Sequence, residues 1–331
     1  MAIRSSATAV AHSNIALVKY WGKRPIPGNY PAVPSLSLTL DRLFTRTQVT
    51  FDADLNQDEF ELDGAQVVGP GLQRVARLLD EVRDQARTQS RARVCSVNNF
   101  PTAAGLASSA SGFAALALAA SSAAALQWPL QQVSSLARAS SASAARSVFG
   151  GWVALGVGAR SAERLPACPD WDLALVIAVT EKGPKSVGST EGMNLCSATS
   201  CVYLPWLERS PLLFERARLA LSQGDLTALG QAMEESTWLM HATMMTATPA
   251  LVYLAPVSLE IIRLIRNRRS SEVPAYFTTD AGPHVKVLTA LEHAEEVMSW
   301  LADIPGVSEV LVCRPGPDAF VESSESEGGI A

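Results

Sequence analysis

The sequence predicts an α/β protein with two domains. Its 331 residues suffice for two domains or one large one, and 48% hydrophobic with 18% charged residues is typical of a globular protein. Strand and helix patterns alternate in the first half, residues 189–267 have the pattern of successive helices, and strand patterns return near residue 275. We therefore expect domains at 1–185 and 186–322, followed by a serine- and glutamate-rich tail (323–331) that is expected to be disordered.

Local patterns predict the elements of the first half. Three segments have strand character, and the last of them alternates apolar with polar residues: 7–18, 35–40 and 45–51. The Asp63-Gly64 pair is a favoured two-residue turn, so residues 59–68 are predicted to form a hairpin. A helix over 70–87 is expected to turn its leucines and valines toward a core and its arginines toward solvent.

The remaining elements again mix helices with strands. After a strand at 93–98, an alanine-rich helix is expected to open near Gly105 and to end near Trp128, and Pro129 suits the first turn of the next helix. Another helix is predicted at 289–301. Further strands are predicted at 152–157, 172–180, 275–279, 285–287 and 307–312.

The stretch 99–112 places glycine and small hydroxylated residues at the start of the alanine-rich helix. The first N–H groups of a helix have no intrahelical acceptor, and the helix dipole adds partial positive charge, so an anion binds there readily. Gly105 permits a tight turn, and Ser108, Ser109 and Ser111 offer hydroxyl donors. The stretch predicts either a phosphate-binding helix start or a turn that serves packing alone.

Composition argues against several functional classes. The net charge of -5 does not favour a nucleic-acid surface. The alanine-rich run 114–126 is interrupted by serines and is short for a membrane span, so we expect no membrane partner. The five cysteines lack C-x-x-C spacing, which favours reduced thiols over a zinc site or a disulfide framework. A cytoplasmic protein is the resulting expectation.

Three clusters of cations are candidates for anion binding. Residues 19–24 hold two lysines and an arginine, which repel one another unless an anion or solvent lies between them. Ser143 and Arg146 share one predicted helix face, where they can grip a carboxylate or phosphate or, equally well, belong to a structural ion pair. Residues 181–190 carry two lysines before a Ser-Thr capping signal, for which an ordinary capped helix is the simpler interpretation.

A single acid completes this set. Asp280 follows a predicted strand and precedes Ala-Gly-Pro, a turn expected to direct the carboxylate into a cleft, although most such segments are only turns. A phosphate-type helix start, several cations and one carboxylate together suit phosphoryl transfer. Positioning and neutralisation of phosphate charge supply most of the catalysis in that chemistry, with Mg²⁺ assisting.

Six segments together resemble the signature segments of the diphosphomevalonate decarboxylase family, within the GHMP kinase superfamily. They occur in order between residue 11 and about residue 290: 14–24, 35–40, 98–109, 141–151, 188–193 and 279–283. The string Asn-Asn-Phe-Pro-Thr-Ala-Ala-Gly-Leu-Ala-Ser-Ser is highly specific. The resemblance implies a ribosomal-protein-S5-domain-2-like N-terminal domain and a GHMP kinase-type C-terminal domain, with the active site in the cleft between them.

The resemblance also implies an activity. ATP would phosphorylate the tertiary 3-hydroxyl of (R)-5-diphosphomevalonate, and loss of that phosphate with CO₂ would give isopentenyl diphosphate and ADP. Phosphorylation makes a good leaving group, and a carboxylate held antiperiplanar to it can then fragment. ATP and Mg²⁺ are the implied cofactors, and a homodimer is the implied assembly.

Residue by residue, the resemblance implies three groups of functional positions. Asp280 matches the catalytic aspartate, Lys19 the lysine beside the reacting centre, and Arg146 the arginine that holds the substrate carboxylate. The substrate-binding positions are Tyr20, Trp21, Gly22, Lys23, Ser141, Ala142, Ser143, Ala144, Ala145, Arg146, Ser189 and Thr190. The nucleotide phosphate loop comprises Ala103, Ala104, Gly105, Leu106, Ala107, Ser108 and Ser109, with Ser108 as the expected contact to phosphate or Mg²⁺.

The chain departs from the family pattern at the end of the site expected to hold the 5-phosphate. An arginine expected at the start of the helix after the hairpin aligns with Gly71, and Arg74 lies about one turn along. Residues 32–34 are Ala-Val-Pro where a polar pair is usual, and the loop at 182–185 is slightly longer than usual. A 5-phosphomevalonate decarboxylase, a mevalonate 3-kinase and a catalytically silent binding protein therefore stay open as alternatives.

Overall fold

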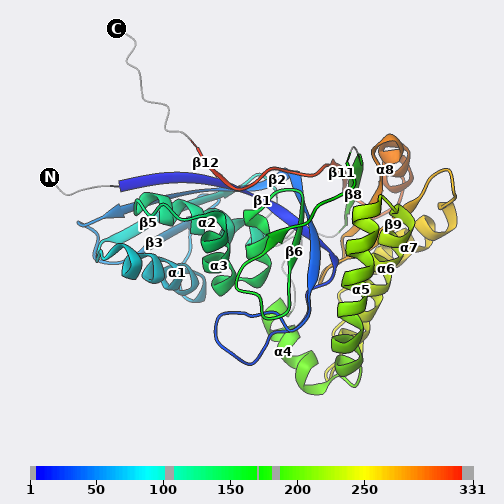
Figure 1. Cartoon of the computed structure of the whole chain (residues 1–331), viewed down its shortest axis with the longest axis horizontal. Helices are drawn as coiled ribbons and strands as arrows, with labels where there is room; N and C mark the ends of the chain where they lie inside the picture. Colours follow the sequence, from blue (N-terminus) through cyan, green and yellow to red (C-terminus); the bar gives the residue numbers. More distant parts are fainter. Residues whose placement is uncertain (1–4, 101–107, 170, 181–186, 323–331) are drawn as a thin grey trace, which may run out of the picture.

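A computed structural model describes residues 5–100, 108–169, 171–180 and 187–322, whose strands form two sheets (Figure 1). The predicted phosphate-loop positions 103–107 and the predicted tail at 323–331 lie outside the described residues. Within the described ranges, no helix is both long enough and apolar enough to cross a membrane.

The first sheet is built around two long antiparallel strands. In strand order it runs β12-β1-β2-β5-β3-β4, with β6 paired to β2 and β7 to β6, and only β3 and β5 pair in parallel among these described strands. The bounds are β1 (Ser5–Val18), β2 (Ser35–Asp52), β3 (Glu59–Leu62), β4 (Ala65–Gln66), β5 (Arg91–Asn98), β6 (Trp152–Leu155), β7 (Glu163–Arg164) and β12 (Phe320–Val321). The pairing of β1 with β2 shifts register twice, between His12 and Asn14 and between Ala16 and Val18.

Helices rich in small residues pack against this sheet. They are α1 (Pro70–Ala86), α2 (Ser108–Ala123), α3 (Leu130–Ser140) and the 3₁₀-helix η1 (Ala142–Val148). The buried alanines of α2 contact β1 and β2, because side chains this small let the helix approach the strands closely. The alanine-rich run is therefore a core helix, as the sequence predicted.

The second sheet lies between two layers of helices. Its antiparallel order is β11-β8-β10-β9, with bounds β8 (Leu173–Val179), β9 (Ala275–Thr279), β10 (Val285–Ala290) and β11 (Glu309–Cys313). Alternate residues of β8 join two different cores: its leucines pack with α5 (Tyr203–Gln223) and α6 (Leu226–Met245), and its alanines with α7 (Pro256–Arg268) and α8 (Ala294–Ala302). A strand buried on both faces explains the continuous apolar run at 173–179.

The two halves of the chain meet along the inner ends of the long strands. Ile15 and Leu17 of β1, together with Leu36 and Leu38 of β2, share one buried cluster with residues of α5 and α6. Figure 1 shows β1 and β2 running from the first sheet toward these helices, with α4 (Ser189–Thr199) below them. The sheets divide the chain between β7 and β8, whereas the boundary at 185/186 stays a prediction, because sheet membership alone does not define a domain.

Two element predictions were wrong in their limits. The strands expected at 35–40 and 45–51 are one strand, β2, because Asp41 and Arg42 interrupt the apolar pattern without interrupting the backbone pairing. The alanine-rich helix ends at Ala123 and not near Trp128, since Ala125 takes a left-handed conformation with φ of 56°.

Two further corrections concern helix starts and helix faces. The helix expected at 289–301 begins at Ala294, after the end of β10 and a short 3₁₀-turn, η2 (Leu291–His293). Not every arginine of α1 faces solvent, because Arg83 is buried and pairs with Asp58 through two hydrogen bonds of 2.9 Å.

Candidate active site

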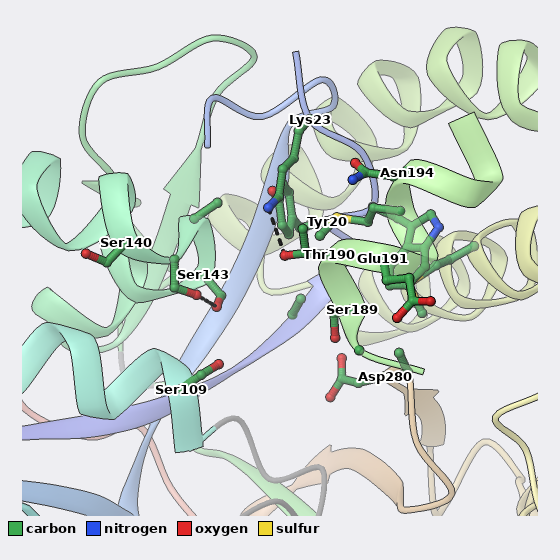
Figure 2. Close-up of a pocket in the computed structure, with 18 of the residues that line it drawn as sticks. Tyr20, Lys23, Ser109, Ser140, Ser143, Ser189, Thr190, Glu191, Asn194 and Asp280 are labelled. Carbon is green, nitrogen blue, oxygen red and sulfur yellow. Dashed lines mark hydrogen bonds between the residues drawn. The ribbon is translucent and has the colours of Figure 1, made fainter. Parts of the chain in front are cut away.

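A cleft of about 870 Å³ lies between the two halves of the molecule (Figure 2). It is lined by the end of β1, by the loop after it, by η1, by the first turn of α4 and by the residue that follows β9. The predicted positions that line it are Tyr20, Trp21, Lys23, Ser109, Ser141, Ala142, Ser143, Arg146, Ser189, Thr190 and Asp280. Segments far apart in the sequence thus converge on one cavity.

Other predicted positions lie beside this cavity. Ala144 and Ala145 are fully buried behind η1, and Ser108 lines a smaller neighbouring cavity of about 260 Å³. Arg74 and Ser109 line both cavities, so the two spaces adjoin. The five loop positions Ala103, Ala104, Gly105, Leu106 and Ala107 belong to the part of the chain that is not described.

Asp280 is the acid that reaches the cleft, and two lysines hold it there. The Nζ atom of Lys19 donates to Oδ1 of Asp280 at 2.7 Å, and the Nζ atom of Lys286 donates to Oδ2 at 2.9 Å. The side chain of Asp280 is 27% exposed, whereas each lysine side chain is 1% exposed. Lys19 was predicted beside the reacting centre, and it acts on the cleft through Asp280.

The charges of this triad set its protonation states. Burial by itself raises the pKa of Asp280, but the ammonium groups of Lys19 and Lys286 outweigh burial and hold that pKa far below its usual range. Burial lowers the pKa of Lys19 to about 8, against the attraction of Asp280 and with the repulsion of Lys286. At neutral pH the triad therefore holds one carboxylate and a protonated Lys19.

His241 lies behind the same triad. Its Nε2 atom is 2.7 Å from the hydroxyl of Thr279, the residue that precedes Asp280. Burial, followed by the charge of Lys19, lowers the pKa of His241 to about 4. The imidazole is thus neutral at physiological pH and leaves the positive charge to the lysines.

Arg146 is a buried cation with polar but uncharged partners. It is 2% exposed, and its guanidinium donates to Oδ1 of Asn14 (3.2 Å), Oγ of Ser37 (3.1 Å) and Oγ of Ser35 (2.7 Å). No carboxylate among the described residues lies within ion-pair distance of it, so the predicted alternative of a structural ion pair is wrong for this part of the chain. Burial lowers the pKa of Arg146 to about 10, which still leaves it charged at neutral pH.

The local structure of η1 explains how Arg146 reaches the cleft. Residues three apart lie in line along a 3₁₀-helix, so Ser143 and Arg146 still share a side although the segment is not an α-helix. Both residues line the cavity. A buried guanidinium at the cavity wall is a strong site for a planar carboxylate or a phosphate.

A tight turn positions the residues that follow β1. Gly22 has φ of 124°, and a Cβ there would lie 2.4 Å from the hydroxyl oxygen of Tyr203, so no side chain fits. The turn sends Lys23 into the cavity, where its Nζ donates to the hydroxyl of Thr190 at 2.9 Å (Figure 2). The buried hydroxyl of Tyr20 has no hydrogen-bond partner within the described part of the chain, which leaves it free for a ligand.

The first turn of α4 forms the opposite wall. Its N-cap is Gly188 rather than the predicted Ser-Thr pair, and no side chain caps the helix. Ser189 and Thr190 instead occupy the first two helical positions and line the cavity. Their side chains are therefore available to a ligand near the positive end of the helix dipole.

Arg74 contributes a second cation at the mouth of the cavity. Its guanidinium lies 4.5 Å from the centre of the Phe113 ring, and it donates to the carbonyl oxygen of Ser140 at 3.2 Å. Burial, and then the charge of Arg74, lower the pKa of Lys23. Two like charges facing one cavity favour an anion between them.

Lys286 and Arg74 show what the sequence prediction missed or left open. Lys286 was absent from the predicted site, although one lysine within the apolar strand 285–290 is an unusual feature of the sequence. Arg74 was noted only as a departure from the family pattern, and it lines the cleft.

Two family profiles match most of the chain. Residues 11–165 match the profile described as diphosphomevalonate decarboxylase-like N-terminal domain. Residues 175–317 match the profile described as mevalonate 5-diphosphate decarboxylase C-terminal domain.

Similar proteins align over nearly the full length of this chain. A phosphomevalonate decarboxylase from Haloferax volcanii is 34% identical over 325 residues, which cover 97% of this chain and 99% of the relative. The crystal structure of mevalonate diphosphate decarboxylase from Staphylococcus aureus has a TM-score of 0.91 at 35% identity, over 97% of this chain and 99% of that one. A structure of MDDEF in complex with MVAPP, AMPPCP and magnesium has a TM-score of 0.91 at 38% identity, over 97% and 100% of the two chains.

Proposed function

The chain belongs to the diphosphomevalonate decarboxylase family, and on that premise we propose that it converts (R)-5-diphosphomevalonate and ATP to isopentenyl diphosphate, ADP, phosphate and CO₂. The 3-hydroxyl oxygen forms a bond to the γ-phosphorus as ADP leaves. The C3–O bond then breaks to release phosphate, while the electrons of the C1–C2 bond form the C2=C3 double bond and CO₂ departs. The observation that carries the proposal is a lysine-held carboxylate, Asp280, in the same cleft as Arg146, a buried arginine without an ionic partner among the described residues.

Asp280 is proposed to orient the substrate 3-hydroxyl. With both carboxylate oxygens engaged by ammonium groups, its pKa lies far below the usual range, so it is a weak base before the reaction. Phosphoryl transfer has a loose transition state in which positioning matters more than early deprotonation. Asp280 therefore accepts a hydrogen bond from the hydroxyl and receives its proton late in the transfer.

Arg146 is proposed to hold the substrate carboxylate. Its guanidinium is fixed by three hydrogen bonds and keeps its charge, so a bound carboxylate is oriented as well as neutralised. Fragmentation requires the C1–C2 bond to lie antiperiplanar to the leaving phosphate. A rigid arginine supplies that alignment without further reorganisation.

The nucleotide is proposed to bind where α2 begins, with Ser108 and Ser109 beside its phosphates. No group of three or more acidic, histidine or cysteine side chains that could hold a metal occurs in the described ranges. This fits a Mg²⁺ bound largely through phosphate oxygens and water, with a serine hydroxyl such as that of Ser108 as a protein ligand. The ion would neutralise phosphate charge during transfer.

Lys23 and Arg74 are proposed to hold the terminal phosphates of the substrate. Gly71 offers no side chain for that purpose, and a Cβ there would lie 2.7 Å from a methyl group of Val67. The phosphomevalonate decarboxylase from Haloferax volcanii favours a second candidate substrate, 5-phosphomevalonate. A cavity with two cations at its mouth suits the more highly charged diphosphate better.

Steady-state assays with mevalonate, 5-phosphomevalonate and 5-diphosphomevalonate test the proposal directly. ADP and CO₂ are measured together for each compound. Equal amounts of ADP and CO₂ from the diphosphate, at the highest kcat/KM of the three, are expected. ADP without CO₂ would indicate a kinase and contradict the decarboxylase, whereas preference for the monophosphate would select the second candidate.

Replacing Arg74 by Met is expected to lower kcat/KM for the diphosphate about 10-fold, the cost of one charge-assisted hydrogen bond. The loss for the monophosphate should be smaller, because that substrate lacks the terminal phosphate. Arg77→Met is the matched control, since Arg77 is an exposed arginine of the same helix that does not line the cleft. Equal losses for both substrates would contradict this role for Arg74.

The pH dependence of kcat is expected to report Lys19. Because the pKa of Lys19 is about 8, its ammonium group loses its proton above that pH and Asp280 loses one of its two donors. We therefore expect kcat to fall with a midpoint near pH 8 at saturating substrate. In Lys19→Arg the guanidinium stays charged, so this alkaline limb should disappear; an unchanged limb would exclude Lys19 as its source.

A homodimer in the cytoplasm is also proposed, on the family resemblance. Sedimentation equilibrium of the purified chain tests the assembly. A mass near twice the 35.2 kDa of one chain is expected, and a mass of one chain at micromolar concentration would contradict it.

A further inference from the structure

Lys286 is a lysine in a place that normally holds an apolar residue. It lies within β10, which pairs with β8 on one side and β9 on the other, and its side chain is 1% exposed. A lysine is almost never buried without a partner, because removing its charge from water is costly. Its Nζ atom donates to Oδ2 of Asp280 at 2.9 Å and to the carbonyl oxygen of His284 at 3.4 Å.

The two lysines that hold Asp280 come from different halves of the molecule. Lys19 follows β1 of the first sheet, whereas Lys286 and Asp280 both belong to the β9–β10 hairpin of the second sheet. The contact of Lys286 with Asp280 therefore does not depend on how the two halves are placed around the cleft. Neither lysine lines the cavity, so both act through the carboxylate.

We propose that Lys286 is a positioning residue that fixes the carboxylate of Asp280 within the second half of the molecule. It sets the orientation of the carboxylate plane by occupying Oδ2, and it leaves the bond across the cleft to Lys19 on Oδ1. This inference rests on the proposed function, because it assigns how the catalytic aspartate is held.

Charge gives the inference a readout that packing alone does not provide. Lys19 is faced by Asp280 after β9, Lys286 from β10, Arg146 from η1 and His241 from α6. Lys286 is one of the groups that lower the pKa of Lys19. Removing the charge of Lys286 therefore raises the pKa of Lys19 and moves the alkaline limb of kcat to higher pH.

The experiment compares Lys286→Met with the wild-type chain in pH profiles of kcat and KM. We expect kcat to fall about 10- to 100-fold, as for a small misplacement of a catalytic group, with little change in KM. The alkaline limb should move above its wild-type midpoint. Lys286→Gln, which keeps a donor without the charge, should show the same shift of the limb with a smaller fall in kcat, and it decides the test if the Met variant does not fold.

Thr289→Val is the matched control on the same strand. Thr289 is buried and donates from its hydroxyl to the carbonyl oxygen of Pro274 at 2.9 Å, away from the cleft. It should lose stability while the kcat of its folded fraction and its alkaline limb stay unchanged. A folded Lys286 variant with the wild-type limb would overturn the proposal, and a wild-type chain without turnover would overturn the proposed function before any variant is made.

Discussion

Asp280→Asn is expected to lower kcat by roughly 10²- to 10⁴-fold, the range found for positioned acid–base groups. Asn cannot accept a proton at the end of phosphoryl transfer, and its amide offers one oxygen to the two lysines that now share the carboxylate. KM should change little, because the group acts mainly in the transition state. Single-turnover measurement of ADP formation tests this at the phosphorylation step.

The same substitution is expected to destabilise the fold. Without its carboxylate, Lys19 and Lys286 become two buried like charges, and breaking a buried ion pair costs about 3 kcal/mol or more. Urea denaturation measures that loss, and kcat is then taken per folded molecule. Asp58→Asn is the control, because Asp58 is a buried carboxylate paired with Arg83 and does not line the cleft. A near-normal kcat for Asp280→Asn would refute the catalytic role.

The fold was predictable where apolar periodicity decides the element. The hairpin at Asp63-Gly64, the strand at 275–279 and the amphipathic helix α1 were predicted within a few residues. Limits failed where a single backbone conformation or a tertiary contact decides. Arg83 looks like a solvent-facing residue until Asp58, which is far from α1 in the sequence pattern of the helix, supplies its partner.

The site was predictable to the extent that motifs carry it. Asp280 and Arg146 each come from a distinctive segment, so their positions in the cleft follow once the family pattern is recognised. Lys286 has no such segment, and an isolated lysine in a strand suggests a solvent-facing residue. Only the pairing of β9 with β10, in which Lys286 lies opposite Thr278, brings it beside the carboxylate two residues later.

Arg146→Met is expected to lower kcat/KM for diphosphomevalonate by roughly 10²- to 10³-fold. Truncating one partner of a buried charge pair typically costs about 2–5 kcal/mol, and each 1.4 kcal/mol is about tenfold. Arg146→Lys should recover only part of the loss, because one ammonium cannot bond Ser35 and Ser37 while also meeting a planar carboxylate. ADP and CO₂ are measured together, and CO₂ should fall at least as far as ADP because carboxylate alignment is lost.

A structural explanation for such a loss can be separated from the proposed one. Arg146→Met also removes the donor to Asn14, Ser35 and Ser37, so some loss of stability is expected in any case. Arg83→Met removes an equally buried arginine whose ionic partner, Asp58, is internal to the protein. It should destabilise the fold and leave kcat/KM per folded molecule unchanged. If both variants lose kcat/KM only in proportion to their unfolded fraction, then the charge of Arg146 supports the fold and does not bind the substrate carboxylate.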